Sequence, residues 1–265
     1  MVFESPVFAL KGGTGINLFW NNLPRISVDL DVVYTDPEPT RDVAIAEITE
    51  ELRKICYMFE HQLGIGAHWP ESDEVKCVAI RGDTQVKIEV NPVFRGTLLD
   101  VEFLPLCPKA FSDFPMSSGM IPVLARDEIY ASKLVAALAR QHPRDLFDMK
   151  MLADNGGISE IMLDCFTLYL ATSSKPFHEV LFGHDHDLSD EYRTAFRGMS
   201  DIKCSIADMN QTRVALRAEL KARLPGRRLN FLNLSFLGAR TGICSLSRLS
   251  RIYLQSVGSF SMSAN

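Results

Sequence analysis

Two features that membrane and secreted proteins commonly carry are missing from this chain. It has no run of about 18 apolar residues, which is the length that a membrane-spanning helix needs. Its first residues, Met1–Pro6, include neither the basic start nor the apolar stretch of a signal peptide. We therefore expect no membrane span and a cytoplasmic location.

Closely spaced cysteine pairs are also missing. The six cysteines are scattered and include no Cys-x-x-Cys pair: Cys56, Cys77, Cys107, Cys165, Cys204 and Cys244. This spacing argues against a zinc knuckle and against a disulfide framework. The sequence therefore predicts reduced thiols.

Acidic residues are missing from the C-terminal stretch. Residues 228–265 hold four arginines and eight serines but no Asp, Glu or Lys, although the whole chain has a net charge of −5. The rest of the chain therefore carries a charge of −9. Such an acidic protein needs a local basic patch to bind nucleic acid, and its charge also suits a basic protein partner.

The abrupt change in composition after Arg228 has two interpretations. In the first, residues 228–265 are a poorly ordered tail or a partner-binding segment. In the second, they are translated in a shifted reading frame that replaced the native C-terminus. Resequencing of the source gene separates the two, because the second requires an acidic helical ending in the other frame of related genes. A matching in-frame tail in relatives would contradict it.

The first half of the chain combines helical and strand patterns. Strict alternation of apolar residues predicts half-buried strands, and a period near 3.6 predicts helices. On this basis we expect helices over residues 14–22 and 40–62, the second with Thr40 as its N-cap, and strands over residues 26–34, 75–80, 84–91 and 98–105. A turn at Gly82-Asp83 joins two of these strands. The pattern predicts a small α+β unit with a mixed or antiparallel sheet.

Helix dominates from residue 126 onward. We expect helices over residues 127–140, from Pro143, and over 158–171, 189–199 and 205–222, with proline at a favoured first position of the second. A stretch rich in Pro, Ser and Gly at 107–125 marks a boundary. We therefore divide the chain into an α+β domain (1–115), a helical domain (116–227) and a tail (228–265).

The residues that can carry chemistry begin with a glycine pair and two aspartates. Gly12 and Gly13 form a turn that lets backbone N–H groups approach an anion. Asp29 and Asp31 follow on a predicted strand, where a spacing of two puts both side chains on one face. Two neighbouring carboxylates repel each other unless a cation lies between them, and Mg²⁺ is often shared between carboxylates and phosphates. Taken singly, each feature is also common as an ordinary turn or a solvated strand face.

In this order, the glycine turn, the helix and the Asp-x-Asp strand resemble the nucleotidyltransferase fold shared with DNA polymerase β. A second motif narrows the resemblance, because Lys133 on a helix is followed by Pro143–Asp148, which has the sequence Pro-Arg-Asp-Leu-Phe-Asp. Together with Lys11–Thr14 and Arg25–Asp31, it is similar to the AbiEii/AbiGii toxin family of nucleotidyltransferases. The resemblance covers residues from about 5 to 155 and fades in the helical remainder.

The resemblance implies a metal site and a third acid. Asp29 and Asp31 would hold one or two Mg²⁺ ions, with Mn²⁺ as a substitute. Glu89 lies on the polar face of its strand, where it would help to deprotonate an attacking hydroxyl. The alternative for Glu89 is a cross-strand partner of Lys87 or Arg81.

The resemblance also implies a nucleotide site. The residues that would bind the nucleotide are Gly12, Gly13, Thr14, Arg25, Ser27, Lys133, Arg144 and Asp145. Lys133 lies on the flank of an apolar helix stripe, from which a long side chain reaches a cleft. Structural alternatives exist for Thr14 as a helix cap and for Arg25 and Lys133 as surface charges.

Two acids of the second motif share a helix face. Asp145 and Asp148 are three residues apart, and the resemblance places Asp148 in the active site. Arg144 would pair with Asp148 and orient it, whereas Asp145 would equally suit the first turn of a helix. A further acidic and histidine-rich loop, His184–Asp187, offers no third and fourth ligand at a known spacing, so we favour a structural role for it.

The activity that the resemblance implies is transfer of a nucleoside monophosphate. An acceptor hydroxyl attacks the α-phosphorus of a nucleoside triphosphate (NTP), and pyrophosphate leaves. The family further implies an acceptor such as the tRNA 3′ end, a role in a toxin–antitoxin or phage-defence pair, and an antitoxin encoded by a neighbouring gene. Two alternatives use the same fold: an inactive nucleotide- or partner-binding module, and an enzyme that nucleotidylylates protein.

Overall fold

The computed structural model describes residues 2–27, 29–69, 75–91, 95–114 and 119–239. The chain forms two compact units, Met1–Ala125 and Arg126–Asn265. The boundary thus follows Ala125, whereas the sequence analysis set it at residue 115. The first unit is a sheet with helices, and the second is helical. This is the predicted α+β architecture with a mainly helical C-terminal part.

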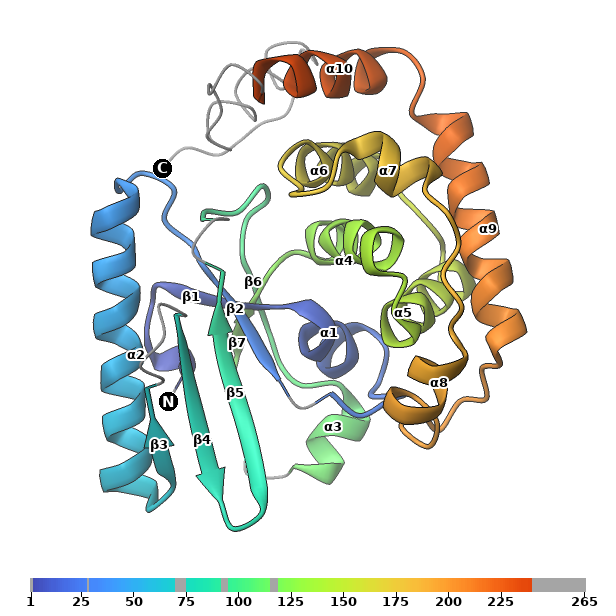
Figure 1. Ribbon diagram of the computed structural model, residues 1–265. Helices are drawn as coiled ribbons and strands as arrows, with labels where there is room; N and C mark the ends of the chain where they lie inside the picture. Colours follow the sequence, from blue (N-terminus) through green and yellow to red (C-terminus); the bar gives the residue numbers. More distant parts are fainter. Residues whose placement is uncertain (1, 28, 70–74, 92–94, 115–118, 240–265) are drawn as a thin grey trace. The chain divides into compact units, whose positions relative to one another are not determined.

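A seven-stranded mixed sheet organises the first unit, in the order β3-β4-β5-β2-β1-β7-β6. Its strands are β1 (Phe8–Lys11), β2 (Leu30–Tyr34), β3 (Gly66–His68), β4 (Lys76–Arg81), β5 (Thr84–Val90), β6 (Glu102–Leu104) and β7 (Ile121–Val123). Strand β2 runs antiparallel to β1 and parallel to β5, so the central strands carry both kinds of pairing. Figure 1 shows β4, β5 and β2 side by side.

Helix α2 (Arg41–Leu63) packs against β3 and β4 (Figure 1). Its buried residues recur at helical spacing: Ala44, Ile48, Leu52 and Ile55. From β2, the Tyr34 hydroxyl donates a hydrogen bond to Glu47 on this helix. Since side chains alternate along a strand, Tyr34 identifies the face of β2 that α2 covers and leaves Asp31 on the opposite face. Thr40 is the N-cap as predicted, although its side chain makes no capping hydrogen bond.

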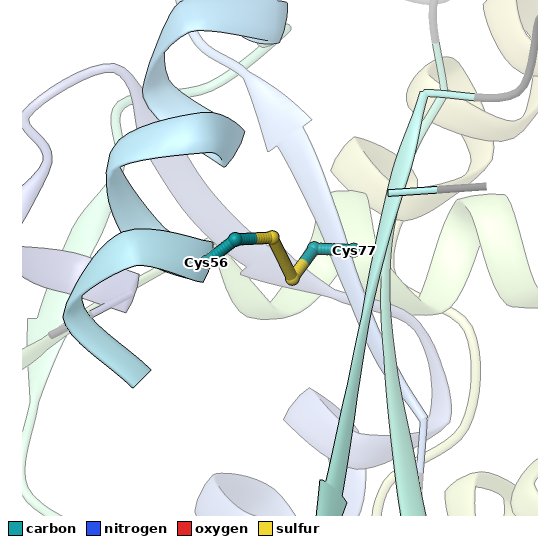
Figure 2. Close-up of a disulfide and its surroundings, with 2 residues drawn as sticks. All are labelled: Cys56 and Cys77. Atoms are coloured by element: carbon teal, nitrogen blue, oxygen red, sulfur yellow. A yellow bond between two sulfur atoms is a disulfide. The ribbon is translucent and has the colours of Figure 1, made fainter. Parts of the chain in front are cut away.

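The prediction of reduced thiols is wrong for two cysteines. Cys56 on α2 and Cys77 on β4 form a disulfide, with their Cα atoms 6.6 Å apart (Figure 2). Their separation of 21 positions hides the pair in the sequence, because only the packing of β4 on α2 brings them together. Three other cysteines are buried thiols, namely Cys107, Cys165 and Cys204, and Cys244 lies outside the described residues.

The first helical segment starts earlier than predicted and the strand after it starts later. Helix α1 (Gly12–Gly15) continues as a π-helical turn over Ile16–Trp20, against the predicted 14–22. Strand β2 begins at Leu30 rather than at residue 26, and Ile26 is 58% exposed. Just before the strand, the Asp29 carbonyl and the Ser27 hydroxyl are hydrogen-bonded to the Thr14 hydroxyl.

Other predicted strands and turns match the structure closely. Strands β4 and β5 lie within a residue of the predicted 75–80 and 84–91, and Gly82 adopts φ +59° in the turn between them. The strand expected over 98–105 is limited to β6. The elements without a prediction are β1, β3, β7, a 3-10 turn at Val2–Glu4, α3 (Pro108–Asp113), α7 (Phe177–Phe182) and α10 (Arg227–Ala239). All of them except α10 are short.

The second unit consists of helices around a buried core. It contains α4 (Arg126–Arg140), α5 (Pro143–Asp154), α6 (Glu160–Ala171), α7, α8 (Ser189–Ala195), α9 (Ile206–Arg223) and α10 (Arg227–Ala239). Helix α4 packs on α5 and α6, and Pro143 occupies the first turn of α5 as predicted. Among the helices that the structure describes, none is long and apolar enough to cross a membrane.

The beginning of the tail belongs to the helical core. In α10, Phe231 and Leu232 are buried. The Arg228 guanidinium is buried as well and lies 2.7 Å from both Asp164 and Glu160 of α6. Residues 240–265, the larger part of the predicted tail, lie outside the described residues.

Candidate active site

Four charged residues lie in one line across the centre of the sheet. Asp31 of β2 is in register with Lys11 of β1 on one side and with Glu89 of β5 on the other, and Glu89 is in register with Lys76 of β4. Residues in register on paired strands project from the same face. This line, Lys11–Asp31–Glu89–Lys76, therefore lies on the face opposite α2 and places the two acids on adjacent strands.

The register shows which residues flank Glu89 on the neighbouring strands. Lys87 precedes Glu89 on the same strand and is in register with Val78, and Arg81 is in register with Thr84. Neither residue is therefore the cross-strand partner of Glu89. Glu89 is instead flanked by Asp31 of β2 and by the basic Lys76 of β4, so its role as a third carboxylate stays a prediction.

Gly12 lies directly against Asp31. Its φ is +72°, and a Cβ built there would overlap Asp31 Oδ2 and lie 3.0 Å from Asp31 Cβ. The glycine is thus required both by backbone conformation and by the lack of space. The glycine turn and the aspartate strand, far apart in the sequence, form one local structure.

Thr14 connects this turn to the residues around Asp29. Its hydroxyl bonds to the Asp29 carbonyl and to the Ser27 hydroxyl, the latter at 2.9 Å. A hydroxyl has one proton, so it donates to the carbonyl and accepts from Ser27. Thr14 is 5% exposed. Its observed contacts position the Asp29 backbone, a role that the sequence analysis did not foresee.

Arg25 is buried rather than a surface charge. It is 4% exposed, and its Nη1 donates to the Ile26 carbonyl at 3.0 Å. Asn17, also fully buried, donates to the Gly13 carbonyl at 2.6 Å. These bonds hold the backbone in the glycine turn and just before the aspartates.

A second charged cluster forms within the helical unit. Lys133 Nζ on α4 lies 2.8 Å from Asp145 Oδ1 and 3.3 Å from Asp148 Oδ2 on α5. All three side chains are buried. Arg140 Nη2 reaches the other oxygen of Asp145 at 2.8 Å. The predicted shared face of Asp145 and Asp148 is therefore the face that binds Lys133.

The charges in this cluster act on Asp145. Burial favours a higher pKa for the Asp145 carboxyl, but the neighbouring charges of Lys133 and Arg140 lower its pKa below the ordinary value. At neutral pH the cluster accordingly contains an ionised Asp145. The burial of the Lys133 side chain also excludes the interpretation of Lys133 as a surface lysine.

The ion-pair partner of Asp148 is Lys133, not the Arg144 suggested from the i,i+4 spacing. Among the described residues no ion pair joins Arg144 to Asp148. Arg144 instead uses its backbone N–H, which donates to Nδ1 of the helix cap His142 at 3.1 Å. Arg140 was missed because only the short connection between α4 and α5 brings it to Asp145.

The His184–Asp187 loop has a structural role. The Asp185 carboxylate pairs with Arg213 at 3.2 Å and also with Arg217. Gln141 hydrogen-bonds the backbone of the same loop at His184 and His186. In the part of the chain that the structure describes, no group of three or more His, Cys, Asp or Glu residues forms a metal cluster.

Comparison with solved structures identifies the fold. The chain is similar to MenT4, nucleotidyltransferase toxin Rv2826c from Mycobacterium tuberculosis H37Rv, with a TM-score of 0.68 and 16% identity, over 93% of this chain and 84% of that one. A second match, to the E. coli MS115-1 CdnC:HORMA-deltaN complex, has a TM-score of 0.23 and 12% identity over 94% and 81% of the two chains. No curated protein matches the chain. The fold is that of a nucleotidyltransferase toxin.

The family follows from the sequence match. The model of the family described as "Nucleotidyl transferase AbiEii toxin, Type IV TA system" matches residues 1–210. The chain belongs to this family, and the resemblance drawn from its two motifs is confirmed. It is a nucleotidyltransferase toxin of a type IV toxin–antitoxin system.

Proposed function

We propose that this enzyme transfers a nucleoside monophosphate from an NTP to a hydroxyl at the 3′ end of an RNA, with tRNA as the acceptor. The observation that carries the proposal is the register of Asp31 with Glu89 and the contact of Asp31 with Gly12; Asp29 lies two residues before Asp31 in the chain. Acids on adjacent strands beside a glycine turn provide a place for a metal-bound triphosphate and for a proton acceptor.

Asp29 and Asp31 are the residues that would hold Mg²⁺ or Mn²⁺. Their carboxylate oxygens are hard ligands of the kind that Mg²⁺ takes together with substrate phosphates. The contact with Gly12 holds the Asp31 side chain in one place, and the Thr14 hydroxyl holds the Asp29 backbone. When bound, the metal neutralises charge on the α-phosphate and the departing pyrophosphate.

The chain's own residues then have distinct roles. Glu89 accepts the proton of the attacking hydroxyl, and Gly12, Gly13 and Thr14 line the triphosphate. Arg25 and Ser27 border the aspartates on the side of the nucleotide phosphates.

Lys133 is proposed to bind the triphosphate from within its cluster. An ammonium group has three N–H donors, and Asp145 and Asp148 account for two, which leaves one for a phosphate oxygen. Asp145 and Asp148 keep Lys133 charged and oriented, and Arg144 adds positive charge at the start of the same helix. We assign no base preference to this site.

The test is label transfer by purified protein. Each α-labelled NTP is incubated with Mg²⁺ and total tRNA, and labelled RNA and labelled protein are separated on a denaturing gel. We expect labelled RNA with the wild type and a loss of at least about 10²-fold with Asp29→Asn or Asp31→Asn. Asp83→Asn, in the β4–β5 turn, is the control and should label RNA normally.

Each alternative has its own outcome in this experiment. Label on protein instead of RNA would identify a protein-nucleotidylylating enzyme. No label in either product, under conditions in which a related enzyme works, would favour an inactive binding module. Transfer that survives both aspartate changes would contradict the metal assignment.

We further propose that a neighbouring gene encodes the antitoxin and that the pair acts in phage defence. Membership in a type IV toxin–antitoxin family supports the proposal. Induction of this chain alone should arrest growth, and co-expression of the neighbouring gene should restore it. Growth arrest that the neighbouring gene leaves unchanged would contradict this pairing.

A further inference from the structure

We infer that the face of strands β3, β4 and β5 beside Glu89 binds the phosphodiester backbone of the RNA acceptor. The surface consists of Lys76, Lys87 and His68, and we call it the hairpin face. The inference rests on the proposed function, because it assigns a place to the acceptor of that reaction.

The strand registers place these residues on one face. Cys77 reaches α2 through its disulfide, so its neighbour Lys76 projects from the opposite face of β4. Lys87 precedes Glu89 by two residues on β5 and shares its face. His68 of β3 is in register with Val78, and Val78 is in register with Lys87. All three basic residues therefore lie on the face that carries Asp31 and Glu89.

The order of the strands tells which substrate approaches this face. Across the sheet, Gly12 follows β1 on one side of Asp31, and Glu89 lies on β5 on the other side. In an in-line displacement, the attacking and departing oxygens lie on opposite sides of the phosphorus. With the triphosphate on the glycine side, the acceptor hydroxyl comes from the side of Glu89, and the rest of the acceptor extends over β5, β4 and β3 (Figure 1).

The charge of this surface suits a polyanion. On the face that carries Glu89, these three strands, all fully described by the structure, hold one acid, Glu89, and three basic residues: His68, Lys76 and Lys87. His68 is exposed, and Lys76 and Lys87 are half-buried, so their stems lie along the sheet while their ammonium groups can reach a ligand. A protein with a net charge of −5 needs such a local basic patch to bind RNA.

Arg81 provides a matched control. It belongs to the same hairpin and carries the same charge, but it lies an even number of residues from Cys77 and thus on the α2 side of β4. Removing Arg81 changes the net charge as much as removing Lys76. The two residues lie on opposite faces of β4, and only Lys76 shares the face of Glu89.

The experiment compares Lys76→Ala, Lys87→Ala and the double variant with Arg81→Ala. Binding of a fluorescent single-stranded RNA with a free 3′ hydroxyl is measured by anisotropy over a salt series, without NTP. We expect the double variant to bind about tenfold more weakly, and the slope of log Kd against log salt to fall by about 0.7 for each phosphate that the variant no longer neutralises. Arg81→Ala should bind within about twofold of the wild type. In the transfer assay, KM for RNA should rise while KM for the NTP stays constant.

Several results would overturn the inference, and they differ from a failure of the proposed function. Equal weakening by Arg81→Ala, unchanged binding by the double variant, or a rise in KM for the NTP would each contradict a role for the hairpin face. So would label transfer to protein, because the acceptor would then not be RNA. If the wild type binds RNA through these lysines but transfers no label, the proposed activity fails and the RNA surface stands.

Discussion

Gly12 and Asp31 form one structural unit: the glycine has φ +72°, and a side chain there would occupy the space of the Asp31 carboxylate. Position 12 and position 31 are thus coupled by sterics as well as by the β1–β2 pairing, in which Lys11 is in register with Asp31. The coupling means that a change confined to the turn reaches an acid proposed to bind metal.

Gly12→Ala tests this coupling. We expect a loss of transfer activity of at least about 10²-fold, because the new Cβ displaces Asp31, and a stability loss of about 1 kcal/mol from the positive φ. Gly64→Ala is the control, since Gly64 has φ +59° at the end of α2 but no heavy atom near its Cβ position. It should lose similar stability in urea unfolding and keep its activity. Full activity in Gly12→Ala would show that Asp31 tolerates displacement.

Lys133→Met should destabilise the helical unit strongly. It leaves the fully buried Asp148 without its ion pair to Lys133, and breaking a buried pair on one side costs about 3–5 kcal/mol. Lys150→Met is the control on α5, where the pair with Asp154 is more exposed, and it should cost less than about 1 kcal/mol. Adding Asp148→Asn to Lys133→Met should restore part of the loss. Equal urea midpoints for the two lysine variants would contradict the buried cluster.

The stability of the helical unit should depend on pH through Asp145. Its pKa is lowered in the folded protein, because Lys133 and Arg140 outweigh the opposing effect of burial, whereas the unfolded chain has the ordinary value of 3.8. Its contribution is therefore fully present above the unfolded pKa and is lost as the pH falls through the folded pKa. The wild type should lose free energy of unfolding more steeply than Asp145→Asn below about pH 5. If the free energy of unfolding of the two proteins changed equally with pH over that range, a contribution of Asp145 would be contradicted.

Arg228 should matter much more than its neighbour Arg227. Arg228 is 7% exposed and contacts Asp164 and Glu160 at 2.7 Å, while Arg227 lies 3.5 Å from Asp164 with about half of its side chain exposed. We expect Arg228→Ala to cost about 3 kcal/mol and Arg227→Ala less than about 1 kcal/mol in urea unfolding. Similarly small losses of stability in the two variants would show that the ion pairs of Arg228 do not anchor α10.

The sequence predicted the central parts of the fold because local patterns determine them. Strands β4 and β5 alternate strictly, Gly82 marks their turn, and Pro143 marks the start of α5. The short strands β1, β3 and β7 have four residues or fewer, too few for a period to emerge. Pairing holds them in place, β1 with β2 and β7 and β3 with β4, and no local pattern shows these pairings.

The candidate site was predictable in its residue types but not in its pairings. The motifs led to Asp29, Asp31 and Lys133, because carboxylates and an ammonium group are themselves the residue types that bind metals and phosphates. The register of Glu89 with Asp31 and the binding of Lys133 by two acids depend on how elements pack. Helical spacing alone suggested Arg144 as the partner of Asp148, whereas α4 supplies a lysine from another helix.

The disulfide between Cys56 and Cys77 yields the last prediction. A bridge across 21 residues restricts the unfolded chain, which in the chain-entropy account is worth about 3 kcal/mol. The purified protein should resist alkylation at both cysteines until a reductant is added, and the reductant should lower its urea midpoint. The double variant Cys56→Ala/Cys77→Ala should show the lower midpoint with and without reductant. Labelling of both thiols in the untreated protein would show that they are reduced, as the sequence alone had suggested.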